Sequence, residues 1–180
     1  MNAVRKNQLQ PSIIKDITLA PYGYKKLEWV KQNMPVLNIL RKEFEVTQPL
    51  AGMTIVCCLH LEAKTGYLLQ TLQAAGARVF ACGSNPLSTQ DDVVAALVDS
   101  GITVYALYGE SPEEYHQFLE LALDALPDAI IDDGADMVTI LHKDRREQAK
   151  TIIGGCEETT TGIIRLRSMD EDQTLLFPMM

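Results

Sequence analysis

Short apolar stretches alternate along this chain with segments in which apolar residues recur every three or four positions. The stretches predict buried strands, and the segments with helical spacing predict helices that have one apolar face. Strands are expected at about 53–59, 77–82, 102–107, 128–133, 151–155 and, as a beginning only, 175–178. Helices are expected at about 21–44, 61–75, 89–99, 112–126 and 136–147, with a last one following 157–162.

Strands that alternate with helices of about ten to fifteen residues are typical of βαβ units and of a parallel sheet. The expected fold class is therefore α/β, a doubly wound and mostly parallel sheet in a three-layer, Rossmann-like sandwich. Residues 1–20 are expected to be a frayed N-terminal lead-in, and residues 21–180 to form one domain.

Three local signals place helix boundaries within this pattern. Pro35 should kink or split the first helix, because proline cannot donate a backbone hydrogen bond. Ser88 and Asp91 form a plausible capping pair for the helix at 89–99. Ser111, followed by proline and then by Glu114, is a clearer start signal.

Composition and charge exclude several classes of function. The chain has 180 residues, 47% of them apolar, and a net charge of -8 without a run of five like charges. Nucleic-acid binding needs clustered Lys and Arg, so no nucleic-acid partner is expected. The apolar runs are too short to span a bilayer, and the first residues show no signal peptide, so no membrane partner is expected either.

The cysteines and the glycines carry no cofactor motif. None of the four cysteines (Cys57, Cys58, Cys82 and Cys156) belongs to a CxxC pair, so no metal site is expected, and reduced thiols indicate a cytoplasmic protein. The first strand is followed by His60 and Leu61 and not by G-x-G-x-x-G, and no G-x-x-x-x-G-K-S/T occurs. The chain therefore has no phosphate cradle of its own for a dinucleotide or a nucleoside triphosphate.

Polar residues gather where four of the predicted strands end. Because the carboxyl ends of parallel strands meet at one edge of a sheet, these clusters should converge on a crevice suited to a polyol such as a ribose, with acid/base chemistry on it. The clusters are His60/Glu62/Lys64, Asn85/Ser88/Gln90, Asp132/Asp133/Asp136 and Glu157/Glu158 with Thr159, Thr160 and Thr161.

Each cluster also has a structural explanation. His60 could be only a helix-entry residue, and Asn85 with the following proline only a turn. The Asp132–Gly134 segment is a common way to leave a strand and cap a helix, and the acids at 157–158 could be a solvated helix start. His116 and His142 lie on helical patterns and are expected to be structural or surface residues.

Considered together, these segments resemble one known family. The sequence from about 14 to 178 is similar to the N-terminal, substrate-binding region of the S-adenosylhomocysteine hydrolase (adenosylhomocysteinase) family. Glu62 and Lys64 stand here as they do in one branch of that family, whereas many members carry Thr and Glu or Gln. The matching segments are His60-Leu61-Glu62-Ala63-Lys64-Thr65, Ser84-Asn85-Pro86-Leu87-Ser88-Thr89-Gln90-Asp91-Asp92, Ile131-Asp132-Asp133-Gly134-Ala135-Asp136 and Glu157-Glu158-Thr159-Thr160-Thr161-Gly162.

The resemblance implies a reaction: reversible hydrolysis of a nucleoside thioether, S-adenosylhomocysteine, to adenosine and homocysteine. In the family, tightly bound NAD oxidises the ribose 3′-hydroxyl, homocysteine is eliminated, water adds, and the ketone is reduced again. The resemblance implies that His60 is an acid/base near the departing sulfur and that Asp133 contacts substrate and assists proton transfer. It further implies cofactor contacts from Thr159, Thr160 and Thr161, and substrate contacts from Leu59, Glu62, Lys64, Asn85, Ser88, Gln90, Asp136 and, at the ribose hydroxyls, Glu158.

Two small departures from the family pattern are Ala135, where a second glycine is usual, and Cys156, where serine is usual. The family also continues past Pro178 into a segment with an active-site lysine and then an NAD domain, and its members are usually homotetramers. We therefore expect the 180-residue chain alone to be inactive. Alternatives are a non-catalytic module for adenosine-like ligands, a fragment of an S-inosylhomocysteine hydrolase, and a structural partner of full-length subunits.

Overall fold

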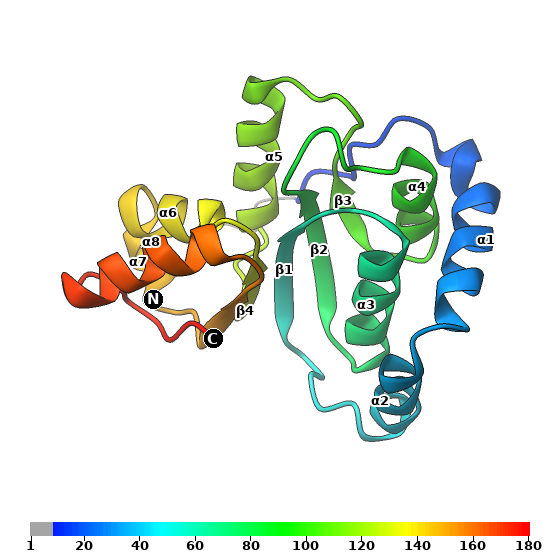
Figure 1. The fold of residues 1–180 in the computed structure, drawn as a ribbon, viewed down its shortest axis with the longest axis horizontal. Helices are drawn as coiled ribbons and strands as arrows, with labels where there is room; N and C mark the ends of the chain where they lie inside the picture. Colours follow the sequence, from blue (N-terminus) through cyan, green and yellow to red (C-terminus); the bar gives the residue numbers. More distant parts are fainter. Residues whose placement is uncertain (1–8) are drawn as a thin grey trace, which may run out of the picture.

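The fold is a five-stranded, all-parallel sheet with the strand order β3-β2-β1-β4-β5, as the computed structural model shows (Figure 1). The structure describes residues 9–180; residues 1–8, which belong to the predicted lead-in, lie outside the described residues. The strands are β1 (Thr54–Leu59), β2 (Arg78–Gly83), β3 (Thr103–Tyr105), β4 (Ala129–Asp132) and β5 (Gly154–Glu157). The prediction of a doubly wound α/β sandwich is confirmed.

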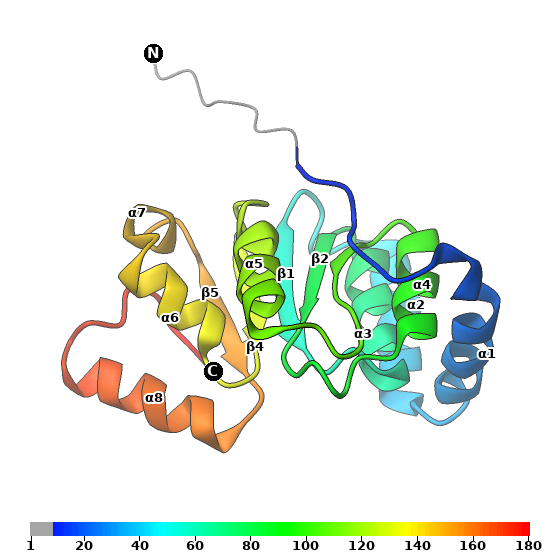
Figure 2. The same cartoon turned by 90° about the horizontal axis from the view of Figure 1, so that it is seen from above.

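Helices lie on both faces of this sheet. Helices α1 to α4 lie on one side of the sheet, and α5 to α8 lie on the other side (Figures 1 and 2). A short 3₁₀ helix, η1 (Ile17–Leu19), precedes them. The α-helices are α1 (Ala20–Lys31), α2 (Pro35–Thr47), α3 (Ala63–Ala74), α4 (Asp91–Asp99), α5 (Pro112–Leu123), α6 (Asp136–Lys143), α7 (Arg146–Ala149) and α8 (Thr160–Glu171).

The sheet separates two hydrophobic cores, because successive side chains of a strand point to opposite faces. Ile55, Cys57 and Leu59 of β1 pack with α1, α3 and α4 in what we call the α3-side core. Val56 and Cys58 of the same strand pack with α5 and α6 in the α5-side core. The two adjacent cysteines therefore face opposite layers, and all four cysteines are free thiols.

The order of the strands places a switch point next to β1. The chain adds β2 and β3 on one side of β1 and then returns to add β4 and β5 on its other side. In open parallel sheets, ligands bind in the crevice outside the carboxyl ends of the strands at such a point. The residues that follow β1 and β4 are therefore the ones best placed for chemistry.

Two of the three predicted helix boundaries are confirmed. The first helical segment is split, and α2 begins at Pro35. Ser111 and Glu114 form a complete capping box, with Glu114 N donating to Ser111 Oγ and Ser111 N donating to Glu114 Oε2. The predicted Ser88–Asp91 cap is wrong: α4 begins at Asp91 without a side-chain cap, because the hydroxyl of Ser88 is used elsewhere.

The helix predicted at 136–147 is broken into α6 and α7. Between them Arg145 leaves the helical conformation, with φ -126° and ψ 42°. Its guanidinium group binds Asp124 and the side chain and carbonyl of Glu120, both on or beside α5. Burial lowers the pKa of Arg145, but the hydrogen bonds and charges of the two acids outweigh this effect and raise it. These contacts across the layer turn the chain where periodicity alone predicts one helix.

The last two predicted strands are placed differently. The fifth strand is Gly154–Glu157 rather than 151–155, because Thr151 still belongs to the turn after α7 and the pairing with β4 begins at Gly154. The sixth strand predicted at 175–178 is wrong, since only Met179 forms an isolated parallel bridge, to Gly155. Leu176 cannot join a ladder because its amide donates to Nε2 of His142 at 2.9 Å.

The N-terminal lead-in is not frayed over its described part. Ile13 lies beside β3, where its amide donates to Val104 O and its carbonyl accepts from Ala106 N, both at 3.0 Å. His142 is a buried structural residue, as predicted, and the exposed His116 is a surface residue. Within residues 9–180, no helix is long and apolar enough to cross a membrane.

Candidate functional site

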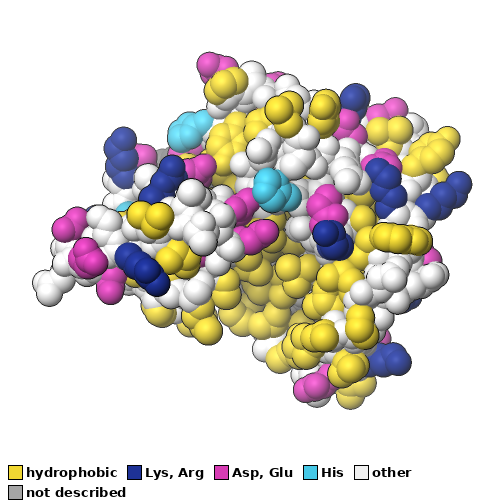
Figure 3. All heavy atoms as spheres, in the orientation of Figure 1, with side chains coloured by type: hydrophobic (Ala, Val, Ile, Leu, Met, Phe, Trp, Pro, Cys, Tyr) yellow, Lys and Arg dark blue, Asp and Glu magenta, His cyan; other side chains and the backbone are white. Residues whose placement is uncertain are grey.

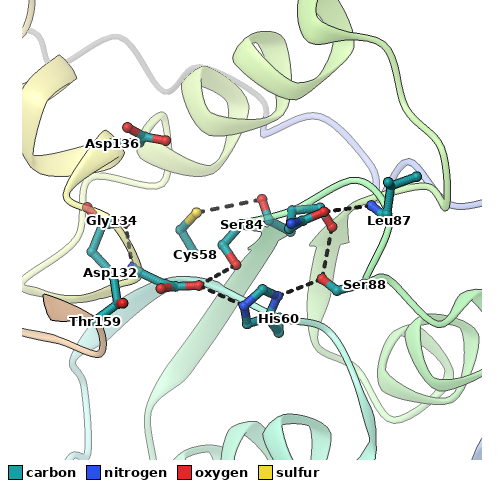
Figure 4. A network of polar contacts seen from close by, with 12 residues as sticks. Cys58, His60, Ser84, Leu87, Ser88, Asp132, Gly134, Asp136 and Thr159 are labelled. Carbon is teal, nitrogen blue, oxygen red and sulfur yellow. Dashed lines mark hydrogen bonds and ion pairs between the residues drawn. The ribbon is translucent and has the colours of Figure 1, made fainter. Parts of the chain in front are cut away.

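Three loops meet at the carboxyl ends of β1, β2 and β4, and their side chains bond to one another (Figure 4). His60, directly after β1, places Nε2 3.2 Å from Oδ2 of Asp133, directly after β4. The other ring nitrogen, Nδ1, lies 2.7 Å from the hydroxyl of Ser88. Ser84 donates to the same Asp133 oxygen at 2.7 Å. The predicted convergence of these strand ends is therefore realised around the imidazole of His60.

The two members of the His60–Asp133 pair differ in how deeply they are buried. The side chain of His60 is 43% exposed, whereas that of Asp133 is only 11% exposed. The imidazole can reach a ligand while the carboxylate orients it from behind. Ser88 has a single hydroxyl hydrogen, which can be donated either to Nδ1 of His60 or to the carbonyl of Asn85, 2.9 Å away. Because the carboxylate of Asp133 can only accept, the hydrogen of its contact with His60 is on Nε2, and the Ser88 hydroxyl can adapt to Nδ1 with or without a proton.

The adjacent Asp132 has a different task. It is fully buried and accepts from the amides of Val138 and Asp133, so it supplies the N-terminal cap of α6. Burial raises its pKa to about 7, and the two amide bonds oppose that effect. The structural explanation of the Asp132–Gly134 segment thus holds for Asp132, while Asp133 faces the site.

Asp136, a predicted substrate residue, is not brought to His60. Its carboxylate accepts from the hydroxyl of Tyr115 at 2.9 Å and pairs with Arg165 at 2.7 Å, which turns it toward α5 and α8. Burial, together with nearby negative charge, raises the pKa of Tyr115, so its hydroxyl remains a donor. Asn85 is also used locally, because its side chain accepts from the amide of Leu87.

A groove of about 520 Å³ opens beside this group, between α2, α3 and the ends of β1 and β5. Its walls are largely apolar, and Glu62, Lys64, Thr65 and Glu158 supply polar groups. The apolar lining consists of Met34, Leu37, Leu59, Leu68, Ile131 and Cys156. In Figure 3 this face shows an apolar hollow below a histidine and several acidic side chains. A flat apolar ring with polar edges, such as a purine, matches such a groove.

Glu62 and Lys64 lie at the start of α3, but they do not pair with each other. Oε1 of Glu62 accepts from the amides of Lys64 and Thr65, both at 3.0 Å, and so caps the helix. The side chain of Lys64 is exposed at the mouth of the groove. Gln90 instead lines a second groove of about 500 Å³ on the other side of this helix start, where it accepts from Lys26.

The three threonines predicted to touch a cofactor open α8. Thr159 is its N-cap residue, and its amide donates to Oε1 of Glu157. Thr160 and Thr161 are exposed on the first turn. Hydroxyls and helix-end amides can contact a dinucleotide, but no glycine-rich phosphate cradle occurs in the sequence, so these residues fit a contact with NAD and not its whole site.

Sequence reasoning missed two participants, Ser84 and Arg165. Ser84 stands in a quoted motif, but only the structure shows that it donates to Asp133 across the crevice. Arg165 binds the carbonyl of Gly134 and the carboxylate of Asp136 from α8, about thirty residues away along the chain. Nothing in the spacing of these residues signals either contact.

Fold and site together define a class: a Rossmann-like domain that presents a histidine–aspartate pair and an apolar groove at its topological switch point. Comparison with known sequences makes this specific. The sequence model of the S-adenosyl-L-homocysteine hydrolase family matches residues 11–154. The chain belongs to that family.

Curated relatives carry two different names. The adenosylhomocysteinase of Pyrococcus abyssi is 58% identical over 165 residues, which are 92% of this chain and 39% of the relative. The S-inosyl-L-homocysteine hydrolase of Methanococcus maripaludis is 54% identical over 167 residues, 93% of this chain and 40% of the relative. The adenosylhomocysteinase of Aquifex aeolicus is 48% identical over 166 residues. The chain thus spans about two-fifths of the length of the curated relatives it matches.

Proposed function

We propose that this chain is the substrate-binding domain of an enzyme that hydrolyses S-adenosylhomocysteine, or its inosyl counterpart, to a nucleoside and homocysteine. The observation that carries the proposal is the contact between His60 and Asp133 beside an apolar groove. Family membership and the names of the relatives support the same reaction. The protein would act in the cytoplasm and, as a whole enzyme, as a homo-oligomer.

Each group in the site has a task in this proposal. The groove between Leu59 and Ile131 takes the purine ring, and Glu158 at its rim accepts from the ribose hydroxyls. His60 donates a proton to, or accepts one from, the 5′ side of the sugar, where the sulfur departs. Asp133 orients the imidazole, with Ser84 holding one of its oxygens.

NAD would supply the oxidation of the 3′-carbon when it is bound. Among the described residues, we assign to it the threonines that open α8, Thr159, Thr160 and Thr161. Binding of the nucleoside is therefore a property that this chain can have by itself, while turnover needs the part of the family protein that carries the rest of the cofactor site.

The decisive experiment is titration calorimetry of the 180-residue chain with adenosine, S-adenosylhomocysteine and, as a negative control, cytidine. We expect saturable binding of the two purine compounds at one site and no turnover of S-adenosylhomocysteine, even with NAD added. The variant Leu37→Trp, at a half-buried position of the lining, fills the groove and should abolish binding, whereas Trp29→Ala, on the neighbouring groove, should not. Absence of purine binding to a folded chain would refute the proposal.

Whether the base is adenine or hypoxanthine depends on the start of α3. Oε1 of Glu62 is committed to two backbone amides, so its other oxygen is left to accept from the ligand. Lys64 can donate to a 6-oxo group, and relatives named S-inosyl-L-homocysteine hydrolase favour this second candidate. We expect Lys64→Gln to change the ratio of adenosine to inosine affinity more than about fivefold, or about 1 kcal/mol. An unchanged ratio would remove Lys64 from the site.

A further inference from the structure

One carboxylate ties together the two loops that carry Asp133 and Glu158. Oε1 of Glu157 accepts from the amide of Gly134 at 2.6 Å and from that of Thr159 at 3.0 Å. Oε2 of the same side chain accepts from the amide of Ala135 at 3.0 Å. Two of the three donors thus belong to the loop after β4, and the third belongs to the start of α8.

The loop after β4 has a backbone that needs such a partner. Gly134 has φ +100°, and Ala135 has φ +62°, a left-handed conformation that is strained for a residue with a Cβ. Ala135 is the N-cap residue of α6 but has no side-chain oxygen for capping. The two consecutive amides instead point at one anion, the geometry of a backbone nest.

The carboxylate of Glu157 has room here because residue 162 of α8 is a glycine. A Cβ added to Gly162 of α8 would lie 2.2 Å from Cδ of Glu157. Gly162 is buried, so no side chain there could turn outward to avoid the clash. From the other side, Arg165 of α8 binds the carbonyl of Gly134 at 2.7 Å. The β4 loop is therefore held at its amides by the last residue of β5 and at its carbonyl by α8.

We propose that Glu157 is a positioning residue: it holds Asp133 against His60 by fixing the backbone of the β4 loop. Asp133 directly precedes Gly134, so the Glu157 contact decides where the Asp133 carboxylate lies relative to the imidazole. The same contact fixes the chain on which Glu158, at the rim of the groove, is carried. The role of the His60–Asp133 pair toward a ligand rests on the proposed function, whereas the positioning contact itself does not.

A simpler role for Glu157 would be to cap α8 through Thr159 alone. The two roles differ in what a variant disturbs. Loss of a helix cap would affect α8 and the overall stability. Loss of the positioning contact would also free the amides of Gly134 and Ala135 and change the environment of the His60 ring, which lies on a different loop.

The test compares Glu157→Gln with the wild-type chain and with Glu147→Gln, a matched change at an exposed carboxylate on α7. Glutamine keeps one acceptor oxygen but places an NH₂ group against a backbone amide. We expect the amides of Gly134 and Ala135 to exchange hydrogen about tenfold faster or more. A factor of this size corresponds to the loss of one charge-assisted hydrogen bond. The ring ¹⁵N chemical shifts of His60 should move toward those of Asp133→Asn, and Glu147→Gln should change neither signal.

Three results would overturn the proposal. The first is unprotected Gly134 and Ala135 amides in the wild-type chain, a measurement that needs no variant. The second is faster exchange in Glu157→Gln that is confined to Thr159 and α8. The third is an unchanged His60 spectrum in a folded Glu157→Gln chain. All three are read without ligand, so a wild-type chain that fails to bind adenosine would refute the proposed function separately.

Discussion

Asp132 should govern a large part of how the stability of this chain varies with pH. Its side chain is fully buried, and burial raises its pKa to about 7 from 3.8 in an exposed aspartate. The folded state therefore binds this proton more tightly than the unfolded state does. The stabilising contribution is fully present below the unfolded pKa near 4 and is lost as the pH rises through about 7.

The magnitude follows from this difference. For each pH unit below the folded-state pKa, the proton on Asp132 adds about 1.4 kcal/mol to the free energy of unfolding. Between pH 5.5 and pH 8 the wild-type chain should therefore lose about 2 kcal/mol of this contribution. Asp132→Asn removes the titration but turns an NH₂ group toward one of two backbone amides. At pH 5.5 the variant should be less stable by about 1–2 kcal/mol, and by pH 8 that difference should disappear or reverse.

The assay is urea unfolding followed by circular dichroism at pH 5.5, 6.5 and 8, a range that stays above the sequence pI of about 4.8. Other groups titrate as well: burial lowers the pKa of His142, and its contribution has the opposite sign below pH 6.5. Such contributions are common to both proteins and cancel in their difference. Stability curves that run parallel for wild type and Asp132→Asn would refute the reasoning.

Two further outcomes concern packing and the C-terminal segment. Gly23→Ala should destabilise the chain by about 3 kcal/mol or more in urea unfolding, because its Cβ would lie 2.0 Å from the backbone carbonyl of Asp92. Gly66→Ala is the matched comparison: it meets the movable end of a leucine side chain at 2.8 Å, and an equal loss would contradict the explanation. His142→Phe should cost about 1–2 kcal/mol at pH 8, because the amide of Leu176 loses its acceptor. The His142→Phe variant should also lose less stability than the wild-type chain as the pH falls below 6.5. An equal loss in the two proteins would show that a group other than His142 causes it.

Much of the fold could be predicted because its signals are local. The apolar run of β1 and the change to helical spacing at α3 are written in consecutive residues. The capping box at Ser111 is equally local, since both partners stand within four positions. Such signals need no knowledge of the rest of the molecule, and they were sufficient for the layer architecture and for the strand ends at His60 and Asp133.

The structure differs from the expected arrangement where a distant partner decides the outcome. Ser88 has the right spacing for a helix cap, but its hydroxyl meets His60, 28 positions earlier. Asp136 stands one turn from Asp133, yet Tyr115 and Arg165 draw it away from the crevice. The residues around 144 have helical character, yet α6 ends where Arg145 reaches α5. None of these competing partners can be found from periodicity.

The division of the interior into two cores also determines which face of the sheet can be packed first during translation. The buried residues of the α3-side core all lie between Ala20 and Ala106. Those of the α5-side core extend from Val56 to Phe177. During translation, one face of β1 to β3 can be packed before the rest of the chain has left the ribosome. The other face of the same strands must wait, with Phe80 and Tyr105 uncovered, until α5 and the segments after it emerge. A chaperone that binds exposed apolar strands would therefore meet this protein over that interval, on the α5 side of the sheet.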